Sequence, residues 1–171
     1  MGHNGAAMPK LVRGRTVLLL GKSQVGKSHM CNVLTGRPGV FREGNKIASC
    51  TLCPKKETIE LCSDAENIVY HISLIDMPGL FDTRTKEDND TLMARIMDFI
   101  RYSMESLDRI FYVMKLGAVS PEEVKCFELV RSLFSQEALD SGIFSLVITH
   151  CDLMSAGERA GVKEAVQQQG S

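Results

Sequence analysis

Residues Gly21-Lys22-Ser23-Gln24-Val25-Gly26-Lys27-Ser28 match G-x-x-x-x-G-K-[ST] at every fixed position, and this motif is the strongest indication of the fold. It follows the apolar run Val17-Leu18-Leu19-Leu20 and precedes a segment of helical character, which is the strand, loop and helix context that makes the motif credible. Glycines let the backbone curl so that successive N–H groups point at phosphate oxygens, and the helix N-terminus adds partial positive charge. The motif therefore predicts a phosphate-binding loop.

Individual side chains of this loop have separate expected roles. We expect Lys27 to place its ammonium on the outer phosphates and Ser28 to offer its hydroxyl to Mg²⁺. The residues expected to contact the nucleotide here are Gly21, Ser23, Gln24, Val25, Gly26, Lys27, Ser28 and His29.

Strands and helices alternate outward from the loop. Apolar patterning predicts strands over residues 15–20, 58–61, 68–75, 109–116 and 144–149, with a hairpin turn between the second and third. Helices are predicted over residues 27–34, 90–106 and 121–134, the last opened by a capping box at Ser120 and Glu123. This alternation predicts an α/β fold with a mostly parallel central sheet flanked by helices. Ligands of such sheets bind at the carboxyl ends of the strands.

Length and charge set broad limits. A chain of 171 residues fits one domain, here residues 15–171 after a flexible lead-in over residues 1–14. Twenty basic against 21 acidic residues give a net charge of −1, which offers no electrostatic case for nucleic-acid binding. No run is long and apolar enough to span a bilayer, and no signal peptide is seen. We expect a cytoplasmic protein, with membrane association only through a partner or an absent segment.

The six cysteines allow two interpretations. Cys50-x-x-Cys53 could supply half of a zinc site, with Cys62 as a further ligand, but a second matching pair is missing. Reduced thiols that pack as small apolar groups are the favoured interpretation.

The segment Asp76-Met77-Pro78-Gly79 follows the third predicted strand and fits D-x-x-G. A carboxylate at Asp76 can hold Mg²⁺ directly or through water, and the Gly79 N–H could reach the terminal phosphate. The alternative for Asp76 is a turn-forming cap. A further metal ligand is expected from the loop before the second strand, with Thr51 as the first choice and Ser49 as the second.

The segment Thr149-His150-Cys151-Asp152 follows the last predicted strand. A carboxylate at Asp152 can accept two hydrogen bonds from the N1–H and N2–H₂ edge of guanine, which adenine lacks, so it would select GTP over ATP. Thr149 and His150 stand where the commoner motif has Asn and Lys. Alternatively, Asp152 caps the following helix, and His150 is either an ordinary exposed histidine or a ring that stacks on the base.

Together these segments resemble the AIG1-type (GIMAP-like) P-loop GTPases over roughly residues 11–153. Residues 21–28 followed by 32–36 are similar to that family's P-loop and first helix, and residues 76–83 are similar to its D-T-P-G-L-F-D-T segment. Residues 111–123 resemble its strand followed by L-G-R-F-T-x-E-E, and residues 149–152 resemble its T-H-x-D variant. The resemblance implies GTP/GDP and Mg²⁺ as ligands, GTP-dependent homodimerisation through the nucleotide face, and a role as switch or scaffold.

Three residues depart from the pattern of such proteins. Gln24 stands where the family usually has Gly, and Ala118 stands where some relatives carry an arginine proposed to act in trans. Leu80 stands where Ras-like enzymes place a glutamine that positions water, which an apolar group cannot do. We therefore expect at most slow hydrolysis, with a non-hydrolysing, GTP-bound interaction module as the alternative. A P-loop ATPase or small-molecule kinase is a third possibility, against which Asp152 and the D-x-x-G segment argue. No closing strand follows Asp152, so the domain is expected to be C-terminally incomplete.

Overall fold

A computed structural model of the protein describes residues 10–43, 54–80, 89–103, 106–158 and 161. Five strands form one sheet in the order β2-β3-β1-β4-β5. Their bounds are β1 Leu11–Leu20, β2 Lys55–Ser63, β3 Ile68–Asp76, β4 Arg109–Lys115 and β5 Phe144–Thr149. Only β2 is antiparallel to its neighbour, which confirms the predicted α/β fold with a mostly parallel sheet.

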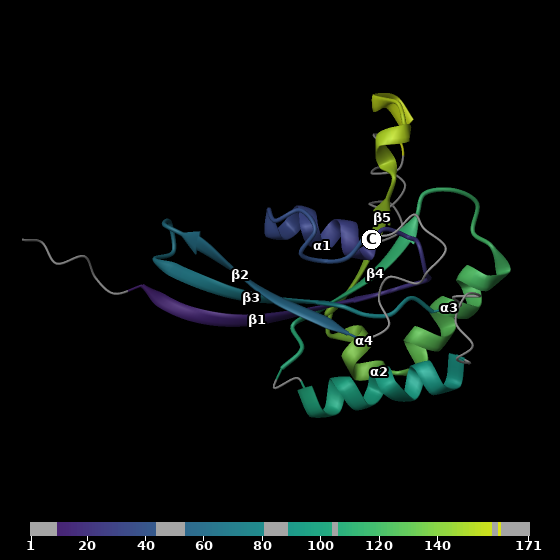
Figure 1. Ribbon diagram of the computed structural model, residues 1–171, viewed down its shortest axis with the longest axis horizontal. Helices are drawn as coiled ribbons and strands as arrows, with labels where there is room; N and C mark the ends of the chain where they lie inside the picture. Colours follow the sequence, from purple (N-terminus) through teal and green to yellow (C-terminus); the bar gives the residue numbers. More distant parts are fainter. Residues whose placement is uncertain (1–9, 44–53, 81–88, 104–105, 159–160, 162–171) are drawn as a thin grey trace, which may run out of the picture.

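Helices lie on both faces of this sheet (Figure 1). One face carries α1, Lys27–Thr35, and the opposite face carries α2, Asn89–Ser103, and α3, Pro121–Ser132. A short α4, Gln136–Asp140, precedes β5, and a 3₁₀ turn, Cys151–Leu153, follows it. The sequence pattern did not predict α4, because five residues are too few for a helical period to be recognised. None of the described helices is long and apolar enough to cross a membrane.

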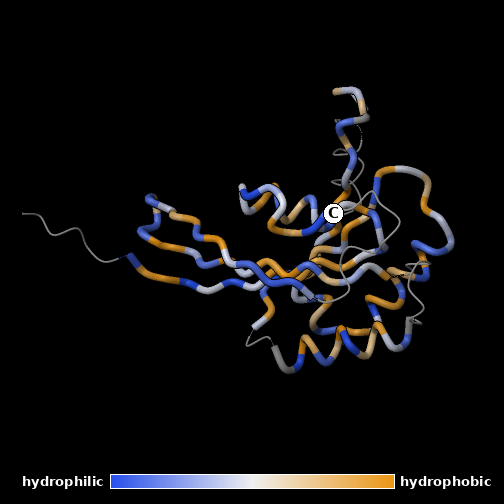
Figure 2. The backbone as a smooth tube through the Cα atoms, viewed as in Figure 1, coloured by the Kyte–Doolittle hydropathy of each residue, from blue (hydrophilic) through white to orange (hydrophobic). Residues whose placement is uncertain are grey.

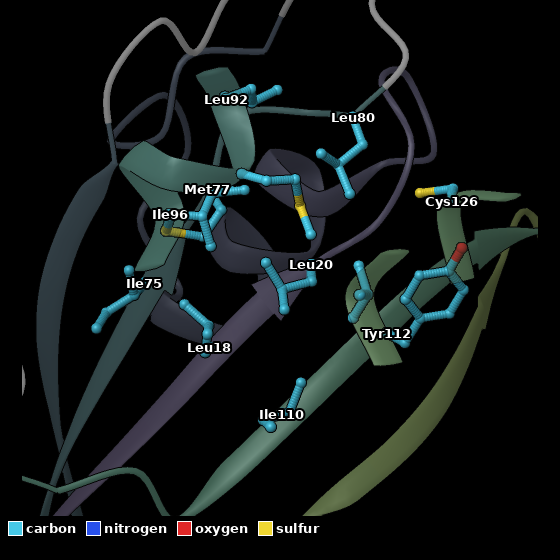
Figure 3. Close-up of a cluster of buried hydrophobic side chains, with 12 residues drawn as sticks. Leu18, Leu20, Ile75, Met77, Leu80, Leu92, Ile96, Ile110, Tyr112 and Cys126 are labelled. Carbon is cyan, nitrogen blue, oxygen red and sulfur yellow. The ribbon is translucent and has the colours of Figure 1, made fainter. Parts of the chain in front are cut away.

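The two faces of the sheet bury separate cores. Residues Leu18 and Leu20 point toward α2 and α3, and Figure 3 shows them among Ile75, Leu80, Ile96 and Tyr112. Residues Val17 and Leu19 point the other way, toward α1. Because strand side chains alternate between faces, the apolar run 17–20 fills both cores, as expected for a central strand.

The start of β1 corrects the expectation of a strand from residue 15 preceded by a flexible lead-in. Residues 11–14 are paired with β3 from Leu11 opposite Ile68 onward. They are exposed in the structure, and their sequence mixes apolar, charged and glycine residues. Apolar patterning therefore did not predict a strand there. Pairing with β3 extends β1 by four residues. The local sequence of β1 cannot reveal this partner strand.

The capping box predicted for α3 is present. Ser120 Oγ accepts from the Glu123 N–H at 3.3 Å, and the Ser120 N–H donates to the Glu123 carboxylate at 2.8 Å. Pro121 occupies the first turn, where its missing N–H costs nothing. Helix α3 ends at Ser132, two residues before the expected end.

Candidate nucleotide-binding site

The phosphate-binding loop connects β1 to α1 at the carboxyl edge of the sheet. Gly21 and Gly26 have φ of 143° and 91°, in the region that glycine favours. A Cβ at Gly21 would collide with the Val113 carbonyl oxygen of β4. The first glycine of the motif is therefore required both by its backbone conformation and by the neighbouring strand.

The side chain of Lys27 lies inside the loop and is 6% exposed. Its Nζ donates to the carbonyl oxygens of Gly21 at 3.1 Å and Lys22 at 2.9 Å. The ammonium thus holds the loop in its curled form while it stands at the N-terminus of α1. A cation and a helix N-terminus at one place favour binding of an anion.

Ser28 and Asp76 lie together beneath the loop, as the sequence predicted for a metal site. The Ser28 hydroxyl donates to Asp76 Oδ2 at 2.5 Å, and Asp76 is 1% exposed. A hydroxyl and a carboxylate are hard oxygen donors, the type that Mg²⁺ takes beside nucleotide phosphates. This donor set fits Mg²⁺, with Ser28 and Asp76 as the residues that would hold it. Thr51 and Ser49, the other expected ligands, lie outside the described residues.

The segment after β3 is fastened to the phosphate-binding loop by its backbone. The Ser23 N–H donates to the Leu80 oxygen at 3.0 Å, and the Leu80 N–H donates to the Gly21 oxygen at 3.2 Å. A Cβ at Gly79 would lie 2.5 Å from the Ser23 Cα, so only glycine permits this approach. The Ser23 N–H is therefore used within the protein, and the expected nucleotide contact of Ser23 stays a prediction. Gly79 lies against the loop, and its contact with a phosphate stays a prediction.

Leu80 itself is fully buried and belongs to the core shown in Figure 3. Its side chain packs with Leu20, Met77 and the α2 residues. The position after D-x-x-G therefore contributes to packing in this protein, and its side chain cannot orient water for attack on a phosphate.

The loop after β5 meets the phosphate-binding loop through Thr149. Its hydroxyl lies 2.6 Å from the Val25 oxygen, 3.1 Å from the Met114 oxygen and 3.0 Å from His150 Nδ1. His150 adopts φ of 60°. Its Cε1 would lie 3.6 Å from a Cβ at Gly26. The ring is thus beside the phosphate-binding loop, and the Thr149 hydroxyl joins two strands to that loop.

Asp152 is exposed in the 3₁₀ turn that follows His150. Its carboxylate makes no capping hydrogen bond to the described residues. The N-cap position of this turn is occupied by His150, whose side chain makes no capping hydrogen bond. An exposed carboxylate two residues after His150 is accessible to an external donor pair such as the guanine edge. His29 is also exposed, and its Nδ1 lies 2.9 Å from Glu43 Oε2.

Asn32 is a structural residue of the site that the motifs missed. It is 4% exposed in α1, and its amide binds the backbone of Phe41 on both sides, donating to the oxygen at 2.8 Å and accepting from the N–H at 2.7 Å. Asn32 Nδ2 also donates to the Glu43 carboxylate. The hydrogen bonds from Asn32 and from His29 together lower the pKa of the Glu43 carboxyl. The amide thereby fixes the chain that leads into the expected metal-ligand loop. The sequence could have indicated this role, because Asn32 is a polar residue on the buried face of a predicted helix.

We expect Asn32→Ala to lower the free energy of unfolding by about 2–3 kcal/mol, because the buried N–H and carbonyl of Phe41 lose their partner. Urea denaturation measures the change. Val33→Ala, at an exposed neighbour in the same helix, is the matched control and should stay within about 0.5 kcal/mol of the original protein. Equal losses in the two variants would contradict the structural role of the Asn32 amide.

Gln24 takes a conformation that a side chain disfavours, with φ of 68°. Glycine avoids the Cβ contacts that make this region costly, so Gln24→Gly should raise the free energy of unfolding by about 0.5–1 kcal/mol. Gln24→Ala keeps the Cβ and should give no gain. If both variants stabilise equally in urea denaturation, removal of the glutamine amide, and not relief of backbone strain, is the cause.

The zinc site, which the sequence left as the less favoured alternative for its cysteines, lies partly outside the described residues. Cys50 and Cys53 lie outside them, and the described part of the chain contains no group of three or more His, Cys, Asp or Glu side chains arranged for a metal. Cys31, Cys62, Cys126 and Cys151 are free thiols. Burial raises the pKa of the Cys31 and Cys126 thiols, so both behave as apolar packing groups.

A curled phosphate-binding loop between a central strand and a helix, with a Ser–Asp pair beneath it, defines a P-loop nucleotide-binding domain. The chain belongs to the AIG1 family, whose pattern matches residues 15–169. No curated protein matches the sequence significantly.

Solved structures with the same fold include Toc33 from Arabidopsis thaliana. Toc33 in complex with GDP and Mg²⁺ is 26% identical with a TM-score of 0.62, over 81% of this chain and 51% of that one. A dimerization-deficient mutant of Toc33 is 27% identical with a TM-score of 0.62, over 84% of this chain and 53% of that one. The septin GTPase domain from Chlamydomonas reinhardtii, 16% identical with a TM-score of 0.56, shares the fold over 94% of this chain and 61% of that one. The chain spans about half the length of the Toc33 chains.

Proposed function

We propose that this protein binds GTP and GDP together with Mg²⁺ and acts as a nucleotide-dependent switch or self-assembling scaffold with slow intrinsic hydrolysis. The observation that carries the proposal is the contact of the Thr149 hydroxyl with the Val25 oxygen, 2.6 Å apart. It brings the loop with Asp152 to the loop that bears Lys27 and lies over the Ser28–Asp76 pair.

Each group has a defined task in this proposal. Lys27 and the α1 N-terminus bind the phosphates, and Asp152 accepts from the guanine edge. Mg²⁺, when bound, neutralises developing charge on the phosphate oxygens. Ser28 and Asp76 orient it. Toc33, crystallised with GDP and Mg²⁺ and with GMPPNP and Mg²⁺, supports this choice of ligands.

Self-association through the nucleotide face is the second part of the proposal. In the Toc33 and Toc159 translocon components, dimerization is important for GTPase activity. Here Ala118 offers no cationic side chain that could act in trans, and Leu80 is buried. These two residues favour the alternative of a GTP-bound module that does not hydrolyse its nucleotide. We propose a cytoplasmic location, for which the free thiols of the described cysteines are suited because a reducing compartment keeps thiols reduced.

The test combines nucleotide competition with single-turnover hydrolysis at several protein concentrations. ATP should displace labelled GTP at least about 100-fold less effectively than unlabelled GTP does, since adenine cannot pair with Asp152. Hydrolysis that rises with protein concentration supports the self-associating switch. Absence of phosphate release at every concentration supports the non-hydrolysing module, and equal displacement by ATP overturns guanine recognition.

A further inference from the structure

The outer half of β1 has a described partner strand on one side only. β3 pairs with β1 from Leu11 onward, whereas β4 joins it only from Val17, opposite Arg109. The strands β1, β2 and β3 extend together beyond the helices, as an arm (Figure 1, Figure 2). Along residues 11–15 no described strand lies on the β4 side of β1.

The backbone of Val12 and Gly14 points outward along this edge. The Leu11 N–H donates inward, to the Asn67 oxygen at 3.1 Å. In a parallel ladder alternate residues bond to opposite sides, so even-numbered residues of β1 face away from β3. Thr16 confirms that even-numbered residues of β1 direct their backbone groups away from β3. Its N–H donates to Asp108 Oδ2 at 2.8 Å, and its oxygen accepts from the Asp108 N–H at 3.0 Å. Beyond this contact, Val12 and Gly14 offer two N–H and two C=O groups to a further strand.

This edge has little protection against pairing with a strand of complementary charge. Natural proteins protect exposed edges with proline, bulges, charged side chains or a covering segment, and of these the described part of this edge has only the charges of Arg13 and Arg15. Here the central outward residue is Gly14, and a Cβ placed on it would have nothing within 4 Å. Leu11 and Val12 are 54% and 57% exposed, which leaves apolar side chains beside the outward backbone groups.

The exposed charge on this edge that has no ion pair with a described residue is the positive charge of Arg13. Arg13 and Arg15 project from the face that also carries Val17, with Arg109 next on the neighbouring strand. Arg15 is paired with Asp108 at 2.8 Å, and Arg13 is exposed, with no hydrogen bond or ion pair to another described residue. A second copy of the chain paired antiparallel about Gly14 would place Arg13 opposite Arg15, and one paired about Arg13 would place Arg13 opposite Arg13; both arrangements bring like charges together, which is unfavourable. A strand with carboxylates at alternate positions would face these arginines with opposite charge.

We propose that the outer edge of β1 is a docking site for an extended acidic segment of another protein, which adds to the sheet as a strand. Its backbone bonds to Val12 and Gly14. Its acidic residues lie on the Arg13 face, and the apolar residues between them lie beside Val12. The site is separate from the nucleotide loops and does not depend on the bound nucleotide.

The test uses a fluorescein-labelled, N-acetylated and C-amidated heptapeptide of alternating glutamate and valine, followed by fluorescence anisotropy. The original protein should bind it saturably. Gly14→Pro removes an outward N–H without removing a bond to β3, and should weaken binding at least about tenfold. Gly14→Ala keeps that N–H and is the matched control, expected to bind as the original protein does. Unchanged nucleotide binding and thermal unfolding show that Gly14→Pro is folded.

Charge reversal tests the chemistry of the partner. Arg13→Glu should weaken the glutamate–valine peptide at least about tenfold and favour a lysine–valine peptide of the same length. Hydrogen exchange should show the Val12 and Gly14 amides protected only when peptide is added. Four outcomes would each overturn the proposal. The original protein does not bind the peptide, or Gly14→Pro binds it equally well. The Val12 and Gly14 amides are protected without peptide, or the protein forms a dimer that Gly14→Pro dissociates.

Discussion

Replacing Lys27 by alanine is expected to weaken the binding of GTP and GDP by about 10²- to 10³-fold. Lys27 is buried in the phosphate loop and its ammonium is held by the Gly21 and Lys22 carbonyls. Hydrogen bonds to charged groups contribute about 1.5–3 kcal/mol each, and about 1.4 kcal/mol corresponds to a tenfold change in affinity. The variant loses the cation that faces the phosphates and also the bonds that keep the loop curled. Fluorescence titration with labelled GDP and GTP measures the affinity.

The matched control is Lys22→Ala, which removes the same charge from the same loop. Only the Lys22 carbonyl takes part in the bond to Lys27, so its side chain can be removed without opening the loop. We expect its nucleotide affinity to change less than about threefold, as for a screened surface charge. Similar losses in both variants would show that general positive charge, and not the position of the Lys27 ammonium, binds the nucleotide. Circular dichroism should show that both variants are folded.

Replacing Asp152 by asparagine is expected to weaken GTP binding by about 100-fold and to create a preference for xanthosine triphosphate. The carboxylate accepts from two donors of guanine, and an amide can accept from only one while its own N–H₂ meets the other. Xanthine carries a carbonyl where guanine has the amino group, so the asparagine amide pairs with it. Competition of GTP, ATP and xanthosine triphosphate against one labelled nucleotide gives the preference.

Two outcomes separate the possible roles of Asp152. A reversal of preference between the guanine and xanthine nucleotides supports base recognition, because a helix cap has no effect on the choice of base. An unchanged preference would contradict the assignment and leave Asp152 as a residue of the 3₁₀ turn. Glu158→Gln, at an exposed carboxylate further along the chain whose pKa is lowered by Ser155, is the control for general loss of negative charge.

The sequence predicted most of the fold because its signals are local and periodic. The run of residues 17–20 indicates a central strand, and Ser120 with Glu123 marks the start of α3 within one turn. Both features depend on residues a few positions apart, whose side chains act on their own backbone. The beginning of β1 and the five-residue α4 escaped prediction since neither has an apolar period of its own.

In the candidate site, too, the features that depend on neighbouring residues could be predicted, and those that depend on distant residues could not. The residue types of the site could be assigned from the motif, which specifies Gly21, Lys27 and Ser28 by the chemistry of phosphate binding. Contacts between distant segments could not. The Thr149 hydroxyl on the Val25 oxygen joins residues 124 positions apart, and the approach of Gly79 to Ser23 depends on how β1 and β3 pack.

By itself, the sequence determined that this chain folds around a phosphate-binding loop, since eight consecutive residues and the apolar strand before them carry that information. Tertiary structure alone decided that Leu80 is a core residue, that Asn32 holds Phe41, and that β1 continues past β4 with Val12 and Gly14 facing outward. The physical reason is that burial and strand pairing are properties of the partners a residue meets. Those partners lie far along the chain and become neighbours only when the sheet has formed.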